Sequence, residues 1–284
     1  RATLPDGRNV ACKIQYPDMM SAVDADLRQL SFIFALYQKY DTAIQTDLIH
    51  DELADRLYEE LDYEREARAL RLYALMLSGG AGVHVPDLIP DLSTKRLLTA
   101  TWMAGRKILD FKTAPATDRS KIAMNLFRAW YVPFYHYGVI HGDPHLGNYS
   151  VGDDLSINLM DFGCIRIFPA KFVGGVIDLY HALERSDRAL AVHAFETWGF
   201  LNLSNDVIDT LLLWAKFLYG PLLDNTVRPI GEITNGIYGR DTAEEVHRRL
   251  QSQGGVRVPR EFVFIDRAAL GLGSVFLHLK AEVN

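Results

Sequence analysis

Three side chains in one short stretch of the chain have the types and the spacing of a site that transfers phosphoryl groups. Asn148 follows Asp143 by five residues, and Asp161 opens an Asp-Phe-Gly sequence 18 positions after Asp143. Carboxylate and amide oxygens are suitable ligands for Mg²⁺, which in such sites is shared with the phosphates of ATP. The stretch therefore predicts that Asn148 and Asp161 hold magnesium, while Asp143 lies where an acceptor hydroxyl would arrive.

A short hairpin is expected to bring these residues together. Strand patterns at about 149–151 and 156–160 enclose the turn signal Gly152-Asp153-Asp154. Because the two strands of a hairpin run antiparallel, the chain returns to its starting point and places Asp161 beside Asn148.

Two histidines beside Asp143 leave zinc binding open as an alternative. His141 and His145 stand four positions apart, but zinc ligands at that spacing usually lie on a helix. Gly142 and Pro144 disfavour a helix here. A further alternative is a buried structural loop, in which the aspartates cap turns and the histidines only pack.

A strand near the start of the chain contains a single charge, Lys13, within the run Val10–Gln15. A lysine on an exposed edge strand would explain this pattern without any chemistry. A helix at about 47–77 offers another explanation, because one glutamate packed over Lys13 would form the ion pair that holds the lysine on the phosphates. Most of the acidic residues of this helix are expected to face solvent.

The elements around these residues predict an α+β fold. Strands are expected at about 83–86 and 96–103, and Ala104-Gly105 ends the second of them as a hinge. Beyond Asp161 the chain is expected to be almost entirely helical. The expected helices are 19–40, 47–77, 118–137, 170–184, 188–198, 205–218, 242–253 and 259–280.

The composition argues against several classes of protein. Of the 284 residues, 49% are hydrophobic and 23% are charged, which is ordinary for a soluble globular protein. The net charge of −6 argues against a nucleic-acid-binding surface, which needs a basic face. The two cysteines, Cys12 and Cys164, are too few for a disulfide framework, and the apolar stretches are shorter than the roughly 20 residues that cross a bilayer.

Five motifs occur in a fixed order along the first part of the chain. They are Val10-Ala11-Cys12-Lys13, Gln15-Tyr16-Pro17, Glu60-Leu61-Asp62-Tyr63-Glu64-Arg65-Glu66-Ala67, His141-Gly142-Asp143-Pro144-His145-Leu146-Gly147-Asn148 and Asp161-Phe162-Gly163. In combination they resemble the UbiB/AarF family of atypical protein-kinase-like proteins, which is linked to ubiquinone biosynthesis. The resemblance runs from about residue 1 to residue 163 and, more loosely, to the helix near Arg267.

The resemblance implies a role for each residue that matches a family motif. The implied catalytic residues are Asp143, Lys13 and Glu66, the ATP-binding residues are Ala11, Lys13, Trp102 and Met103, the magnesium ligands are Asn148 and Asp161, and the family's Glu-x-Asp signature is Glu60 and Asp62. In the family this signature faces an amino-terminal extension that folds over the substrate cleft.

The partner of Lys13 is a specific test of this assignment, in which Glu66 forms the ion pair. In a continuous helix Asp62 and Glu66 share one face, whereas Glu60 points elsewhere. An ion pair of Lys13 with Glu60 instead of Glu66 would overturn the assignment.

The chain departs from the family pattern at three positions. Leu146 stands where the family usually has proline, and Cys12 stands where it has valine; both changes are mild. Thr101 replaces a common glutamate at the hinge, where adenine is read mainly through backbone groups. The family's alanine-rich nucleotide loop and its Lys-x-Gly-Gln motif are expected to precede residue 1, so part of the lid over the phosphates is missing from this chain.

The resemblance further implies a bilobal protein-kinase-like fold. Residues 1–104 would form a small lobe with an antiparallel sheet and long helices, and residues 105–284 a mostly helical lobe with the catalytic loop. The implied function is Mg-ATP binding and hydrolysis, by an ATPase or phosphotransferase that supports ubiquinone biosynthesis. The implied partners are ATP, quinone or lipid intermediates and a ubiquinone-synthesis complex, and the expected location is cytoplasmic with peripheral contact at the inner membrane.

Two other functions remain open. A small-molecule phosphotransferase of the aminoglycoside or choline kinase type also uses a His-Gly-Asp-x-x-x-x-Asn loop, but Gln15-Tyr16-Pro17 and the Glu-x-Asp signature favour the UbiB type. A nucleotide-binding scaffold with little turnover is the second possibility. The presence of Lys13, Asp143, Asn148 and Asp161 argues against this scaffold.

Overall fold

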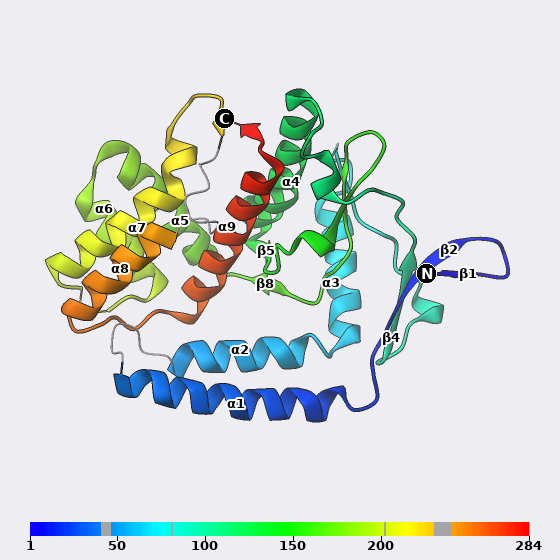
Figure 1. Cartoon of the computed structure of the whole chain (residues 1–284), viewed down its shortest axis with the longest axis horizontal. Coiled ribbons are helices and arrows are strands. Elements are labelled where there is room, and N and C mark those ends of the chain that lie inside the picture. The colour runs from blue at the N-terminus through cyan, green and yellow to red at the C-terminus, as the bar shows by residue number, and fades with distance from the viewer. Residues whose placement is uncertain (41–46, 81, 202, 230–239, 284) are drawn as a thin grey trace. The chain divides into compact units, whose positions relative to one another are not determined.

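The computed structural model describes residues 1–40, 47–80, 82–201, 203–229 and 240–283 (Figure 1). The chain divides into two compact units: the first comprises Arg1–Asp26, Asp55–Ile167 and His278–Glu282, and the second comprises Leu27–Ala54 and Phe168–Leu277 with Val283. The first unit contains every residue that the sequence predicts to take part in catalysis, to bind ATP, to hold magnesium or to form the Glu-x-Asp signature. The division into lobes at residues 104 and 105 stays a prediction.

The structure confirms a mixed α+β fold that is mostly helical. The first unit contains β1 (Ala2–Thr3), β2 (Asn9–Ile14), β3 (Val83–His84), β4 (Leu97–Thr101), β5 (Val139–His141), β6 (Tyr149–Val151), β7 (Ile157–Leu159), β8 (Ile165–Ile167), α3 (Tyr63–Met76) and α4 (Ala116–Tyr137). The second contains α5 (Ala170–Arg185), α6 (Arg188–Trp198), α7 (Asn205–Leu223), β9 (Arg228–Pro229) and α8 (Arg240–Ser252). Four elements have residues in both units: α1 (Met19–Tyr40), α2 (Asp47–Glu59), α9 (Arg260–Leu279) and β10 (Glu282–Val283). The link expected between α1 and α2 lies outside the described residues.

The strand that carries Lys13 is the middle strand of a small antiparallel sheet with the order β1-β2-β4. Lys13 pairs with Leu98 and Ala11 pairs with Ala100. Because side chains alternate along a strand, these two cross-strand pairs share one face of the sheet. The explanation of Lys13 as an edge-strand lysine that points to water is wrong, because its amine binds the carboxylates of Glu66 and Asp161.

The single helix expected at 47–77 is two helices, α2 and α3, separated by residues 60–62. The side chain of Asp62 caps the second helix, because its Oδ1 accepts a hydrogen bond from the backbone N–H of Arg65 at 2.9 Å. Aspartate is a preferred helix N-cap, and this preference explains why a new helix begins here within the range expected to form one helix. Glu60 and Asp62 are consequently not on a common helix with Glu66.

The predicted hairpin is present as β6 and β7, which pair antiparallel with Tyr149 opposite Leu159. A second pairing, β5 with β8, places His141 opposite Ile165. The N–H of Gly142 extends it by donating to the carbonyl of Cys164 at 2.7 Å. The segments that precede Asp143 and follow Asp161 therefore lie side by side, and the two aspartates face one small region of the unit.

Helix α4 delivers the chain into β5. Pro133 lies in its last turn, and Gly138 ends the helix in the left-handed conformation with a φ of 68°. The N–H of Gly138 caps the carbonyls of Phe134 and Pro133, as expected for a glycine just after a helix.

The core of the second unit is rich in aromatic side chains. Trp198 and Phe200 are buried and their rings contact Phe262 at centroid distances of 5.5 and 5.1 Å, while Trp214 is also buried. Packing thus explains these aromatic residues, although Leu201 remains exposed.

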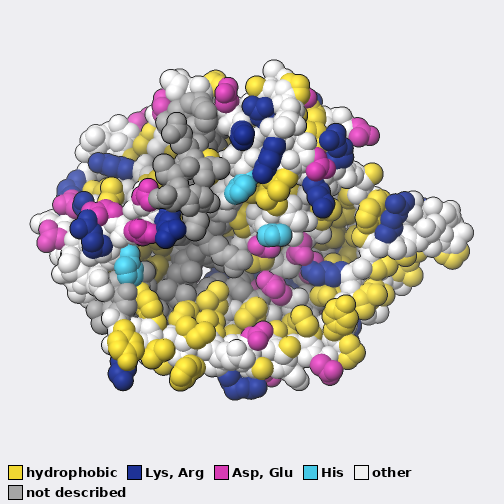
Figure 2. All heavy atoms as spheres, in the orientation of Figure 1, with side chains coloured by type: hydrophobic (Ala, Val, Ile, Leu, Met, Phe, Trp, Pro, Cys, Tyr) yellow, Lys and Arg dark blue, Asp and Glu magenta, His cyan; other side chains and the backbone are white. Residues whose placement is uncertain are grey.

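On the face drawn in Figure 2, Lys and Arg side chains are interspersed with Asp and Glu over the described residues.

Candidate active site

Three charged side chains from distant parts of the chain meet in the first unit. The amine of Lys13 lies 2.9 Å from each carboxylate oxygen of Glu66 and 3.0 Å from Oδ2 of Asp161. Lys13 comes from β2, Glu66 from the first turn of α3, and Asp161 from the segment after β7. The structure therefore places Glu66, and not Glu60, at the amine.

Opposite charges set the pKa values of this cluster. Burial alone would lower the pKa of the Lys13 amine, but the carboxylates of Glu66 and Asp161 raise it above its ordinary value. Burial would raise the pKa of Asp161, and the Lys13 ammonium with the Gly163 N–H outweighs this and lowers it. For Glu66, burial and then the negative charge of Asp161 raise the pKa in spite of Lys13. Two carboxyl groups thus share one ammonium, and a second cation at Asp161 would stabilise the cluster.

A tyrosine that the sequence did not single out for chemistry also contacts the lysine. The ring centroid of Tyr63 lies 5.4 Å from the Lys13 amine, within the range of a cation–π interaction. Tyr63 is the first residue of α3. It is part of the Glu60–Ala67 motif. An aromatic residue directly after the signature residue Asp62 is the feature of the sequence that could have indicated a role for Tyr63.

A cavity of about 100 Å³ opens next to this cluster. It is lined by Ala11, Lys13, Glu66, Leu70, Pro86, Leu98, Ala100, Thr101, Trp102, Met103 and Met160. All four residues predicted to bind ATP are in this lining, together with apolar residues of α3 and β4 that could not be assigned from the sequence. The backbone N–H of Trp102 donates to the Asn9 carbonyl at 3.0 Å, so this particular group is already bonded within the sheet.

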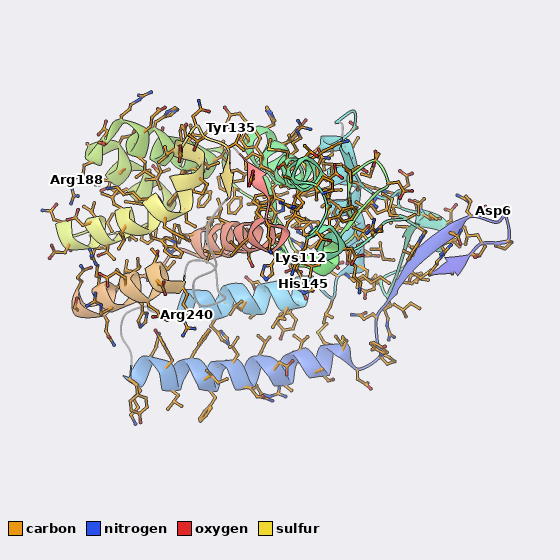
Figure 3. The ribbon with its side chains drawn as sticks, turned by 45° about the horizontal axis from the view of Figure 1, so that its top comes forward. Asp6, Lys112, Tyr135, His145, Arg188 and Arg240 are labelled. Atoms are coloured by element: carbon orange, nitrogen blue, oxygen red, sulfur yellow. The ribbon has the colours of Figure 1, made fainter. Side chains whose placement is uncertain are left out.

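Asp143 and Asn148 form a second cluster, held by hydrogen bonds inside their own loop. The side-chain amide of Asn148 donates to Oδ2 of Asp143 at 2.7 Å and to its carbonyl at 3.1 Å. His145, labelled in Figure 3, begins the short turn Leu146–Asn148, and its Nδ1 accepts from the Gly147 N–H at 3.1 Å. These hydrogen bonds fix the orientation of the Asn148 side-chain amide. Its nitrogen faces Asp143, so its oxygen faces away from Asp143.

The residues predicted to hold magnesium fit that ion. The N–H of Met160 donates to the Asn148 carbonyl at 3.1 Å, which sets Asn148 beside the residue that precedes Asp161. The amide oxygen and the carboxylate are hard oxygen ligands, and Mg²⁺ sites commonly use one or two such groups with phosphates and water. Within the described ranges, no group of three or more His, Cys, Asp or Glu residues is arranged to hold a metal.

His141 is a neutral structural link between the two aspartate segments. Its Nε2–H donates to the carbonyl of Asp161 at 2.6 Å, and its Nδ1 accepts from the N–H of Asp143 at 3.3 Å. These two bonds require the tautomer with the proton on Nε2. Burial, here among the rings of Tyr73, Trp130, Tyr149 and Phe162, lowers the pKa of His141 although the Asp161 carbonyl opposes the shift.

The pH dependence of stability is expected to reveal this buried histidine. Below its ordinary pKa of 6.5 the unfolded chain binds a proton at His141 that the folded chain does not, so the free energy of unfolding falls as the pH is lowered. In His141→Gln, which can still donate and accept, the fall between pH 7.5 and 5.5 is expected to be smaller, by at most about 1.4 kcal/mol per pH unit. Urea unfolding at several pH values measures both; equal slopes would contradict the assignment of a neutral histidine.

A comparison with protein-family models decides which family the chain represents. Residues 1–194 match the model described as ABC1 atypical kinase-like domain. The chain belongs to this family. The resemblance to UbiB/AarF proteins is thereby confirmed, and with it a kinase-like fold; proteins of this kind have ATP-dependent activity in general and generally bind ATP with magnesium.

Several curated proteins are similar to this ABC1 domain. "Protein ACTIVITY OF BC1 COMPLEX KINASE 7, chloroplastic" of Arabidopsis thaliana is 33% identical over 291 residues, covering 100% of this chain and 40% of that protein. "Atypical kinase coq-8, mitochondrial" of Caenorhabditis elegans is 27% identical over 206 residues, with coverages of 71% and 27%. "Atypical kinase COQ8, mitochondrial" of Saccharomyces cerevisiae is 30% identical over 173 residues, with coverages of 61% and 34%. The chain therefore spans less than half the length of these relatives.

A solved structure supports the fold of the ABC1 domain. The complex of Rv3197 with erythromycin from Mycobacterium tuberculosis is 22% identical, with a TM-score of 0.56, and the match covers 96% of this chain and 74% of that chain.

None of the helices in the described part of the chain has the length and apolar character needed to cross a membrane. The sequence-based expectation of a cytoplasmic location differs from the relatives, which are named as mitochondrial or chloroplastic.

Proposed function

We propose that this chain binds Mg-ATP at the cavity beside Lys13 and hydrolyses it or transfers its γ-phosphoryl group, as an ATPase or phosphotransferase of the UbiB type. The observation that carries the proposal is the convergence of Lys13 with Glu66 and Asp161, at 2.9 to 3.0 Å, on the rim of a cavity lined by Ala11, Trp102 and Met103. A cation fixed by one carboxylate and placed beside a second is the arrangement that phosphoryl transfer requires.

Lys13 would bind the phosphates, and Glu66 would keep its amine in place. The bidentate contact with the buried Glu66 carboxylate restricts the amine to one side of the cavity, so that it needs little reorganisation when phosphates arrive. Ala11, Trp102 and Met103 would contact the adenine, for which the small side chain of Ala11 leaves room on the face of the sheet. The contact of Tyr63 with Lys13 supports the same position.

Asn148 and Asp161 would hold magnesium, which when bound neutralises the charge of the phosphates. The lowered pKa of Asp161 keeps this ligand ionised. Asp143 would orient the attacking hydroxyl or water, because the Asn148 amide holds one of its carboxylate oxygens and leaves the carboxylate in a fixed direction. His141 keeps Asp143 and Asp161 at a constant separation through its two hydrogen bonds.

The physiological role is proposed to be support of ubiquinone biosynthesis, with quinone or lipid intermediates and a ubiquinone-synthesis complex as partners and peripheral contact with a membrane. The names of the relatives, which are mitochondrial proteins, support an organellar setting over an unrestricted cytoplasmic one. Glu60 and Asp62 would face a segment that covers the cleft. Membership of the ABC1 family favours this role over that of an aminoglycoside or choline kinase. The presence of Lys13, Asp143, Asn148 and Asp161 favours an enzyme that turns over ATP rather than an inactive scaffold.

Nucleotide titration and hydrolysis by the full chain test the proposal. We expect ATP binding that requires magnesium, and slow hydrolysis that increases when a quinone-like phenol and anionic vesicles are added. Magnesium-independent binding, or no binding of ATP at millimolar concentration, would remove the proposed function. Binding and hydrolysis that are unaffected by the phenol and the vesicles would remove only the proposed quinone and membrane partners.

A further inference from the structure

Arg65 links helix α3 to the segment that carries Asp161. Its Nη1 donates to the carbonyl of Gly163 at 3.0 Å, and its Nη2 donates to the carbonyl of Ile165 at 2.8 Å. Gly163 and Ile165 lie 98 and 100 positions further along the chain. Two hydrogen bonds from one guanidinium therefore join two segments that no local sequence signal connects.

The backbone of Arg65 and a second side of its guanidinium have partners as well. The Asp62 cap accepts from the Arg65 N–H at 2.9 Å, and Glu59, the last residue of α2, forms an ion pair with Nη2 at 3.1 Å. The guanidinium is thus held from the α2 side and from the β8 side together. It is also largely covered, with 26% of its side chain exposed, which strengthens its charge-assisted hydrogen bonds.

The two carbonyls belong to the same segment that positions Asp161. The N–H of Gly163 donates to Oδ1 of Asp161 at 2.9 Å, so Gly163 orients the carboxylate through its N–H while Arg65 holds its carbonyl. The residue after Arg65 is Glu66, which binds Lys13. Arg65 thereby ties the glutamate of the Lys13 ion pair and the aspartate of the Asp-Phe-Gly sequence into one unit.

The chemistry of this link requires an arginine. A guanidinium presents several N–H groups in a fixed planar fork and can reach two carbonyls at once, whereas the ammonium of lysine is a single point charge on a flexible stem. β5 pairs with β8, and Arg65 adds a hydrogen bond to the carbonyl of Ile165, the first residue of β8.

We propose that Arg65 is a positioning residue for the nucleotide site: it keeps Glu66 and Asp161 in the arrangement that binds Mg-ATP before the nucleotide arrives. This inference rests on the proposed function and adds to it a residue that touches neither nucleotide nor metal. Loss of the link lowers the fraction of molecules with a competent site, and apparent affinity falls in proportion to that fraction. At saturating Mg-ATP the bound molecules return to the competent arrangement, so turnover is largely retained.

Three variants test the role of Arg65 in the full chain. Arg65→Gln removes the charge and one of the paired donors, and Arg65→Lys keeps the charge but not the fork. Arg68→Gln is the matched control, because Arg68 lies on the same helix, is 69% exposed and approaches Asp62 only at 4.0 Å. The measurements are the KM for Mg-ATP, kcat, and the rate of amide hydrogen exchange in the nucleotide-free protein.

For Arg65→Gln we expect the KM to rise about tenfold, the effect of one lost charge-assisted hydrogen bond, with kcat changed less than about twofold. Arg65→Lys is expected to lie between this variant and the wild type, and Arg68→Gln to match the wild type. Amide exchange should increase in residues 161–167 and not in the core of α4. A purely structural role would instead accelerate exchange throughout the unit or lower kcat at an unchanged KM, and either result overturns the inference.

The exchange measurement separates this inference from the proposed function. If the wild type fails to bind Mg-ATP, the proposed function is lost, yet faster exchange confined to residues 161–167 in Arg65→Gln would still establish the link. If the wild type binds Mg-ATP while Arg65→Gln shows an unchanged KM and unchanged exchange, the inference is wrong and the proposed function stands.

Discussion

Replacing Asp161 by asparagine is expected to weaken magnesium-dependent nucleotide binding at least about 100-fold while the protein remains folded. Asparagine has the shape of aspartate and can still accept the Gly163 N–H, which Asp161 binds at 2.9 Å. It lacks the charge that attracts a divalent cation and that faces Lys13 at 3.0 Å. Isothermal titration with ATP, with and without magnesium, measures the loss.

The matched control for this experiment is Asp153→Asn, the same change at an exposed residue in the turn between β6 and β7. This control is expected to bind Mg-ATP as the wild type does. An Asp161→Asn protein whose thermal midpoint rises with Mg-ATP as much as that of the wild type would show that Asp161 is not a metal ligand.

Replacing Asp143 by asparagine is expected to leave nucleotide binding intact and to lower kcat by about 100- to 10,000-fold, the usual contribution of a group that accepts a proton in the reaction. Asparagine can still accept the hydrogen bond from the Asn148 amide, which Asp143 accepts at 2.7 Å, so the loop keeps its geometry. It cannot accept a proton from a hydroxyl or a water molecule. Steady-state hydrolysis at saturating Mg-ATP measures the loss of turnover.

A titration of the same Asp143→Asn protein with Mg-ATP is the internal control, because unchanged affinity shows that the site itself is intact. Hydrolysis at the wild-type rate would remove Asp143 from its proposed role. A parallel loss of affinity would instead assign Asp143 to metal binding together with Asn148 and Asp161.

Local sequence was sufficient wherever the residues of the site are close along the chain. Asp143 and Asn148 are five positions apart and meet inside one loop, and a two-stranded hairpin returns the chain to Asp161. Both relations follow from turn chemistry and strand geometry, which act over a few residues. For the same reason α4 and the hairpin were predicted with ends close to the observed ones.

The helix break at residues 60–62 shows where local pattern was misleading. The apolar residues of the expected 47–77 helix continue across the break, and only the side-chain hydrogen bond of Asp62 to the Arg65 N–H marks the new start. A capping bond competes with helix continuation by a small free energy. Glu60 lies between α2 and α3, so its direction does not follow from a helix shared with Glu66, although Glu66 is the residue at the amine as predicted.

The sequence by itself determined the chemical types at this site, the order of its motifs and the membership of a kinase-like family, because these depend on residue identity and short spacing. The tertiary structure decided which glutamate binds Lys13, because Glu66 lies 53 positions further along the chain. It also decided which arginine links α3 to the Asp-Phe-Gly segment. Such contacts depend on how the β2–β4 sheet and α3 pack, and packing is a property of many side chains acting together. Arg65 has an ordinary place in a charged motif until the fold brings the carbonyls of Gly163 and Ile165 to its guanidinium.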